Sequence, residues 1–247
     1  MKSFLTWVRK ELKENALLVA ITAAFIGLSF SIYLFLGDAM IEKLGREDGF
    51  FEDLTAVFFL AGSIVLLLAF FRKKNWFVLF LAVVLFVGMG EEISWGQRLI
   101  GFSTPKAFEK ANVQGEFNLH NLEAVNARTF DRQDRLGWSR LLSINFLYKL
   151  FWFGYGILLP LGLYASGFVR RLAERLKIPA PPFVLGILFL VNYLIMKTLG
   201  TVLPPHPHLQ YLDTLGEAYE CGTALVFLAI SLYFLRTWRK SSTASGS

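Results

Sequence analysis

The segment GMGEEISWGQRLIG concentrates residues that could do chemistry at the end of an apolar run. Glu91, Ser94 and Arg98 are spaced i, i+3 and i+7, so they share one face if the helix continues. The adjacent acids Glu91 and Glu92 oppose the helix macrodipole, which favours cations at a C-terminus, so we expect a metal ion or Arg98 to face them. We predict catalytic roles for Glu91, Glu92, Ser94 and Arg98, with Glu91 as the general base and Arg98 as the group that binds an anion. The alternative is a set of interfacial charges with Trp95 as a membrane-belt residue.

Histidines and further carboxylates predict a metal site. Histidine is the commonest transition-metal ligand, and three histidines can form a catalytic zinc set. A divalent metal, with zinc as the first candidate, is therefore expected, and a carboxylate-rich two-metal site is an equal alternative. The other interpretation is that the loop histidines are solvated and that some carboxylates only cap helices. The chain has no H-E-x-x-H motif to decide between them. The candidate ligands are His120, His206, His208, Glu52, Glu217 and Glu220.

The elements that must position these residues are long apolar blocks. Of the 247 residues, 55% are hydrophobic and 18% are charged, against about a quarter charged in soluble domains. Blocks without a polar stripe are typical of helices that meet lipid. The sequence predicts an all-α, polytopic integral membrane bundle, a single membrane domain over residues 1–240 with a polar tail at 241–247. The six expected spans are residues 16–36, 54–71, 76–96, 150–168, 182–203 and 217–235.

Charge distribution predicts the orientation of the bundle. Four segments, 1–15, 72–75, 170–177 and 236–240, hold 14 of the 25 Lys and Arg residues and only three of the 19 acids. By the positive-inside rule these segments and both termini are cytoplasmic, which suits a bacterial inner membrane. Every candidate site residue then lies on the outer side. Residues 97–143 form the one long outer segment, which we expect to fold as a cap. We expect one short helix from Thr104-Pro105 and another in GEFNLHNLEAVNARTF.

An internal similarity accompanies this topology. FEDLTAVFFLA at residues 51–61 aligns without gaps with YECGTALVFLA at residues 219–229, and Glu52 falls on Glu220. The first two and last two spans could therefore be copies of one hairpin, in parallel orientation. Chance similarity between apolar segments is the alternative.

Three functions remain open from the sequence. The leading prediction is a membrane enzyme with an outer-facing carboxylate and histidine site that catalyses metal-assisted hydrolysis or group transfer on a lipid or lipid-linked substrate. The second is an ion- or proton-coupled transporter that uses the same carboxylates. The third is a non-catalytic membrane scaffold. Nucleic-acid binding is not expected, because the inside-positive loops account for the net charge of +6.

Overall fold

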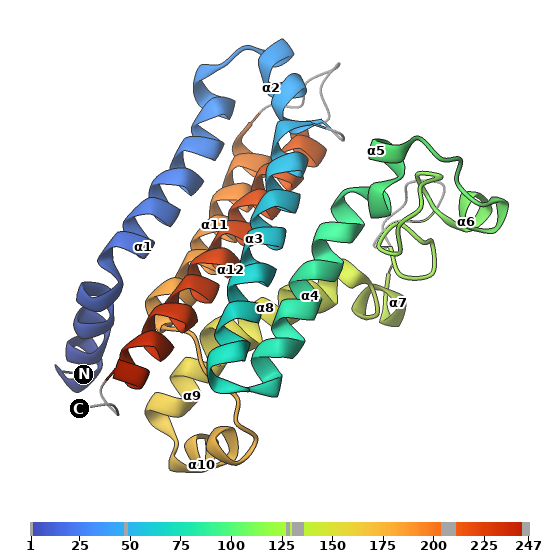
Figure 1. Cartoon of the computed structure of the whole chain (residues 1–247). Coiled ribbons are helices and arrows are strands. Elements are labelled where there is room, and N and C mark those ends of the chain that lie inside the picture. The colour runs from blue at the N-terminus through green and yellow to red at the C-terminus, as the bar shows by residue number, and fades with distance from the viewer. Residues whose placement is uncertain (1, 47–48, 127–128, 130–135, 204–210, 244–247) are drawn as a thin grey trace.

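The computed structural model describes residues 2–46, 49–126, 129, 136–203 and 211–243, and within these ranges the regular structure is helical (Figure 1). The only pairing of β type among the described residues is the single bridge between Asn112 and Leu122. In chain order the elements are α1 (Lys2–Phe35), α2 (Asp38–Gly45), α3 (Phe50–Lys73), α4 (Trp76–Glu92), the 3₁₀ turn η1 (Ser94–Gly96), α5 (Gln97–Ile100), α6 (Lys106–Ala111), α7 (Trp138–Leu141), α8 (Ile144–Phe153), the π-helical turn η2 (Gly154–Leu158), α9 (Leu159–Ala165), α10 (Gly167–Arg175), α11 (Phe183–Val202) and α12 (Tyr211–Thr243).

Helix length and composition agree with a multi-pass membrane bundle. Among the described residues, five stretches are long and apolar enough to cross a bilayer: Ser3–Phe35, Asp38–Lys73, Ile144–Ala165, Phe183–Val202 and Asp213–Trp238. Each of them overlaps a different one of the six predicted spans. The remaining helix, α4, has 17 residues, about 25 Å at 1.5 Å per residue, and is shorter than a hydrocarbon core of about 30 Å.

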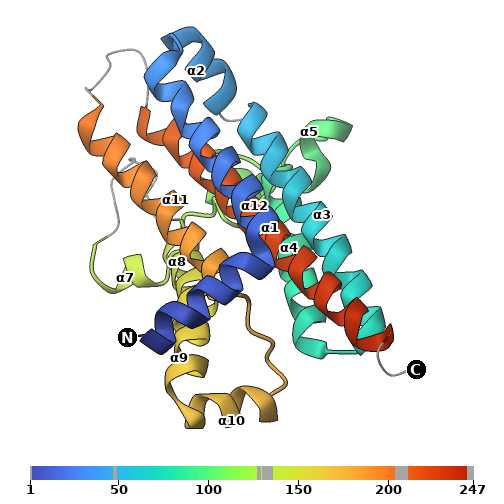
Figure 2. The same cartoon turned by 90° about the vertical axis from the view of Figure 1, so that its left-hand side faces the viewer.

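The helices α3, α4 and α12 pack most closely. Helix α3 lies along both α12 and α4, and α11 packs on α12, while α1 packs across α11 and α12 (Figure 2). Gly62 of α3 lets Leu85 of α4 and Ser231 of α12 approach the backbone, and the Ser63 hydroxyl donates to the Ala82 carbonyl at 2.8 Å. Small residues commonly permit such close contacts between membrane helices. Helix α1 does not pack along α3 as α11 packs along α12, so the similar segments share sequence without sharing a hairpin geometry.

A second close contact joins η2 and α11. At Gly186 of α11, an added Cβ would lie 1.7 Å from the Gly156 carbonyl oxygen of η2. The ring of Phe189, which also belongs to α11, packs against Gly156. Only two glycines allow backbones this near, and this contact fixes how η2 and α11 cross.

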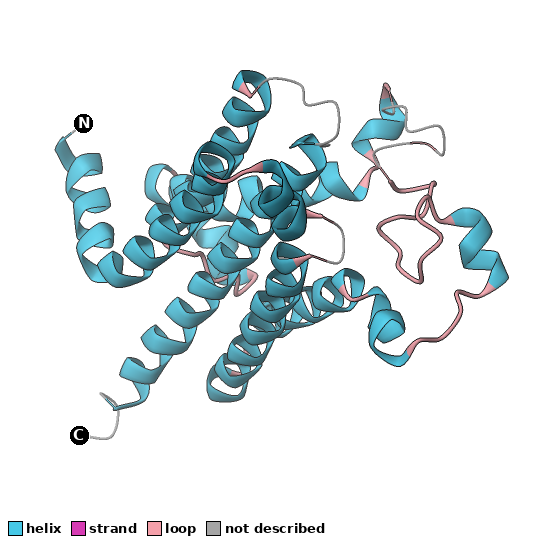
Figure 3. Cartoon of the chain, turned by 90° about the horizontal axis from the view of Figure 1, so that it is seen from above, coloured by secondary structure: helices cyan, strands magenta, loops and turns pink. Residues whose placement is uncertain are grey.

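Charged segments separate to opposite ends of the bundle. The start of α1, the α3–α4 turn, α10 and the end of α12 gather at one end, the lower end in Figure 1. These are the four basic segments of the sequence, so the predicted grouping by side agrees with the fold. The cap extends from the opposite end of α4 and lies beside the bundle rather than over it, as Figures 1 and 3 both show.

Candidate functional site

The end of α4 is built differently from the continuous helix expected from the sequence. The helix ends at Glu92, and Ser94 and Trp95 adopt left-handed backbone conformations with φ of 46° and 53°. The Trp95 ring folds back over Gly90, where a Cβ would lie 2.9 Å from ring carbons. The expectation that Glu91, Ser94 and Arg98 share one helix face is therefore wrong, because the chain turns sharply between them.

Glu91 lies at the centre of the site. Its Oε1 accepts a 2.6 Å hydrogen bond from Trp95 Nε1, and its Oε2 accepts bonds from the backbone N–H groups of Leu119 at 2.6 Å and His120 at 2.8 Å. The His120 Nδ1 atom lies 3.3 Å from the same oxygen. The carboxyl group is 11% exposed and the imidazole 35%. Each carboxylate oxygen thus has its own donors, and hydrogen bonds to a charged acceptor are stronger than neutral ones.

Ser94 forms a second link between α4 and the cap. The residue is completely buried, and its hydroxyl donates to Glu116 Oε2 at 2.7 Å. The side-chain amide of Asn118 donates to both Ser94 Oγ, at 3.2 Å, and Glu116 Oε2, at 2.9 Å. The hydroxyl proton is therefore directed at a carboxylate within the fold, and the hydroxyl is shielded from solvent.

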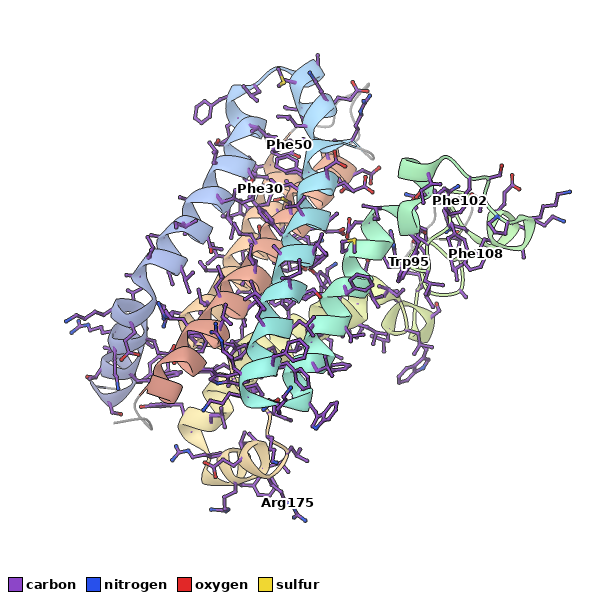
Figure 4. The ribbon with its side chains drawn as sticks, viewed as in Figure 1. Phe30, Phe50, Trp95, Phe102, Phe108 and Arg175 are labelled. Atoms are coloured by element: carbon purple, nitrogen blue, oxygen red, sulfur yellow. The ribbon has the colours of Figure 1, made fainter. Side chains whose placement is uncertain are left out.

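Gln97 and three aromatic rings complete the cap. The Gln97 amide donates to Thr104 Oγ1 at 2.6 Å and accepts from the Phe117 N–H at 2.8 Å. The Phe117 ring packs on Phe102 and Phe108, with centroids 5.8 and 4.7 Å away. In Figure 4, Phe102 and Phe108 lie inside the cap and Trp95 at its junction with α4. Because the Thr104 hydroxyl is used by Gln97, the expected Thr104 cap is replaced by Pro105, and α6 begins at Lys106.

The expected helix in GEFNLHNLEAVNARTF does not form in the described residues 115–126, which are turns. Asparagine side chains take the place of helical backbone bonds. Asn112 binds the Asn118 carbonyl and side chain, Asn121 binds Gln114, and Asn126 binds the His120 carbonyl. Short amide side chains compete with helix formation in this way. The result is a loop whose backbone N–H groups at residues 119 and 120 point at Glu91.

A second group of ionisable residues lies near His120. Glu220 of α12 is within electrostatic range of His120, of Lys149 on α8 and of Glu52 on α3. Glu52 is 8% exposed and Glu220 is partly buried. The two similar segments therefore do bring their matched carboxylates together. Tyr148 interacts electrostatically with both Glu220 and Glu92. Glu217 interacts in the same way with Tyr33, and both Glu92 and Glu217 interact with Cys221.

Lys149 brings a cation to this group, and two further cations interact with Lys149. Lys149 lies within electrostatic range of Arg140 on α7 and of Lys197 on α11 as well as of Glu220. The ammonium groups of Lys149 and Lys197 each lie 5.9 Å from the centroid of the Tyr193 ring. Cations at this distance from an aromatic face are attracted to it. Lys149 thus brings positive charge to Glu220.

The remaining predicted site residues fall elsewhere. His206 and His208 lie outside the described residues, and the side chain of Arg98 is also outside them. Among the residues that the structure describes, no three His, Cys, Asp or Glu side chains are grouped as metal ligands. A direct contact joins His120 to Glu91, whereas Glu220 is linked to His120 and Glu52 by longer-range electrostatic interaction, and the predicted zinc site stays a prediction.

Several residues of this site were not singled out from the sequence. Glu116, Asn118, Arg140, Tyr148 and Lys149 join it only through tertiary packing. One signal was present: four asparagines occur within residues 112–126, and asparagines at such density favour a side-chain-supported loop over a helix.

Comparisons with known proteins give no relationship from which a role could be transferred. No protein-family model, no curated protein and no solved structure matches the chain. The class of protein, a bundle of apolar helices suited to a membrane, therefore comes from the fold alone.

Proposed function

We propose that this chain is an integral membrane enzyme that transfers or hydrolyses a group on a phosphate-bearing lipid or lipid-linked substrate, with its site at the outer membrane surface. The observation that carries the proposal is the contact between His120 Nδ1 and Glu91 Oε2 at 3.3 Å. A carboxylate that accepts a hydrogen bond from Nδ1–H leaves Nε2 free to take a proton from a nucleophile, and it stabilises the imidazolium that results. His120 is then the general base, which is the role the sequence suggested for Glu91.

Glu91 is assigned a positioning role in this proposal. Its carboxylate accepts bonds from Trp95, Leu119 and His120, and both oxygens are directed into the fold. A buried carboxylate with fixed donors orients an imidazole better than it abstracts a proton from a substrate. Ser94 is assigned to support of the cap for the same reason, because its hydroxyl is bonded to Glu116.

The location of the cap supports a lipid substrate. The cap lies beside the end of α4 (Figure 1). Its margin exposes large apolar side chains: Ile100 is 78% exposed, Leu136 80%, Trp138 84% and Leu142 67%. Exposed apolar groups of this size on a membrane protein are typical of contact with the interfacial region. His120 would then be reached from the lipid surface.

The nearby cations support a phosphate on that substrate. Arg140 and Lys197 both interact electrostatically with Lys149, and amino and guanidinium groups are the usual partners of phosphate oxygens. They would hold the anionic group and stabilise charge that develops on it. If a divalent metal binds, His120 would be its most accessible described ligand, with Glu91 holding the imidazole as carboxylates commonly do in metal sites.

The proposal is tested with purified protein in vesicles that contain phosphatidylglycerol, phosphatidylethanolamine and polyprenyl phosphates, with products followed by mass spectrometry. Wild type should release a product, and His120→Asn should lower turnover by about 10²- to 10⁴-fold, the usual contribution of a general base. Glu109→Gln, an exposed change on α6, is the matched control and should retain wild-type turnover. No product from wild type, together with an ion flux that Glu220→Gln abolishes, would replace this proposal with the transporter.

A further inference from the structure

A pocket at the opposite, basic end of the bundle lies between α10, α9 and the turn that precedes α4. Its volume is about 350 Å³, and it is lined by Asn75, Leu163, Arg170, Ala173, Glu174 and Lys177, with Ile178 and Pro179 completing the wall. Of the charged groups that line it, Arg170 and Lys177 are cationic and Glu174 is anionic. Nothing in the proposed outer site uses these residues, which lie at the other end of the fold.

The pocket wall is held in a defined shape. Asn75 caps α4 by accepting from the Val78 N–H at 3.1 Å, and its amide donates to the Lys177 carbonyl at 2.8 Å. Lys177 itself has a left-handed backbone with φ of 53°. One guanidinium nitrogen of Arg170 donates to the Leu163 carbonyl at 3.0 Å. These bonds hold the Lys177 backbone against the start of α4 and the Arg170 guanidinium against α9, and they leave the Lys177 ammonium and most donors of Arg170 for a ligand.

Helix α10 has the form of a helix that lies in a membrane surface. It crosses the end of the bundle rather than running along it (Figures 1 and 2). Its apolar edge is exposed, with Phe168 67%, Leu172 44% and Leu176 55% accessible, and these residues are spaced i, i+4 and i+8 on one face. Ala173 of the same helix is buried against the bundle. Apolar side chains on one edge and cations on the other are what an interfacial helix presents to lipid.

We propose that this pocket binds the headgroup of an anionic phospholipid from the leaflet at the basic end. Arg170 and Lys177 would bind the phosphate. Glu174 reduces the positive charge of the pocket without cancelling it, since two cations face one acid. The four basic segments that gather at this end add a positive field that favours an anionic over a neutral headgroup. The site would fasten α10 to the bilayer and fix the end of α4 opposite the proposed active site.

Lipid binding to the full chain tests this proposal, with dioleoyl-phosphatidylglycerol as probe and native mass spectrometry or a fluorescent lipid competition as readout. The double variant Arg170→Gln/Lys177→Gln should bind the lipid at least about tenfold more weakly, given the usual contribution of each surface cation to anionic-lipid affinity. The control Arg171→Gln/Arg175→Gln removes the same charge from the same helix, outside the pocket, and should bind as wild type does; Arg175 is marked in Figure 4. Phosphatidylcholine and inorganic phosphate should each bind wild type much more weakly.

Three results would overturn the proposal. Equal losses in the two double variants would mean that general surface charge, and not the pocket, attracts the lipid. Unchanged binding in both would remove Arg170 and Lys177 from any lipid site. Tight binding of inorganic phosphate would make the pocket a site for a soluble anion. Since all four substituted side chains are exposed, thermal unfolding in neutral lipid should be the same for both variants, which separates binding from folding.

Discussion

Glu91 and His120 are 29 residues apart in the sequence, yet the Glu91 Oε2 atom is bonded to the His120 backbone N–H and lies 3.3 Å from its Nδ1. One carboxylate oxygen therefore fixes both the loop that carries the histidine and the orientation of its ring. This relationship links the last turn of α4 to the cap, and most of the expectations below depend on it.

Replacing Glu91 with Gln should loosen the cap. The glutamine amide has one acceptor oxygen, whereas the Glu91 carboxylate accepts hydrogen bonds on both oxygens. Its NH₂ group would therefore face either the Trp95 N–H or the backbone N–H groups of Leu119 and His120. Loss of hydrogen bonds to a charged group, at about 1.5–3 kcal/mol each, should lower the free energy of unfolding by about 2–4 kcal/mol. Limited proteolysis of the detergent-purified protein should show faster cleavage within residues 97–143. Glu109→Gln should be cleaved at the wild-type rate, and equal rates for both variants would contradict the anchoring role.

Substitution of Ser94 distinguishes a structural from a catalytic role for this residue in the segment GMGEEISWGQRLIG. Because its hydroxyl is buried and bonded to Glu116, Ser94→Ala should lose about 1–2 kcal/mol of stability and keep most of its turnover. Ser94→Gly should be less harmful, because glycine adopts the positive φ of 46° without strain. Thermal unfolding and product release would be measured on both. A folded Ser94→Ala protein that has lost all turnover would restore Ser94 as a nucleophile.

The contact between Gly156 and Gly186 should tolerate no added side-chain atom. In Gly186→Ala the new Cβ would lie 1.7 Å from the Gly156 carbonyl oxygen, and backbone on both sides cannot move aside without separating η2 from α11. The expected cost is about 3 kcal/mol or more, seen as a marked drop in the unfolding temperature. Gly154→Ala, in the same π-helical turn with open space around it, is the control. Similar behaviour of the two variants would show that the close contact is absent.

Metal content is a separate question from the His120–Glu91 geometry. If His120 is a metal ligand, as the sequence suggested, elemental analysis of wild type should find about one or two equivalents of a divalent metal. The variants His120→Ala and Glu91→Ala should contain none. If wild-type protein holds no metal even after metal supplementation, the metal-assisted mechanism is wrong. The general-base role of His120 would remain, because it requires no metal.

Helix type and charge segregation could be predicted from local sequence, whereas the site could not be predicted fully. Apolar blocks and basic segments are properties of consecutive residues, so the apolar helices could be predicted. For the same reason the sequence could predict that four basic segments gather at one end of the bundle: residues 1–15, 72–75, 170–177 and 236–240. The role of Glu91 could not be predicted, because its donors come from residues 119 and 120 of a loop. The helical rhythm of that loop is overridden by asparagine side chains such as Asn112 and Asn118, which bond within the cap.

The most direct test of the central claim is the tautomer of His120, measured by ¹⁵N NMR on the detergent-purified full chain, with the His120→Asn spectrum used to assign the signal among three histidines. The account predicts that neutral His120 carries its proton on Nδ1, directed at Glu91, and that Glu91→Gln shifts the population towards the Nε2 tautomer. A His120 that carries its proton on Nε2 in wild type, and does not respond to Glu91→Gln, would contradict the carboxylate–histidine pair on which the proposed function rests.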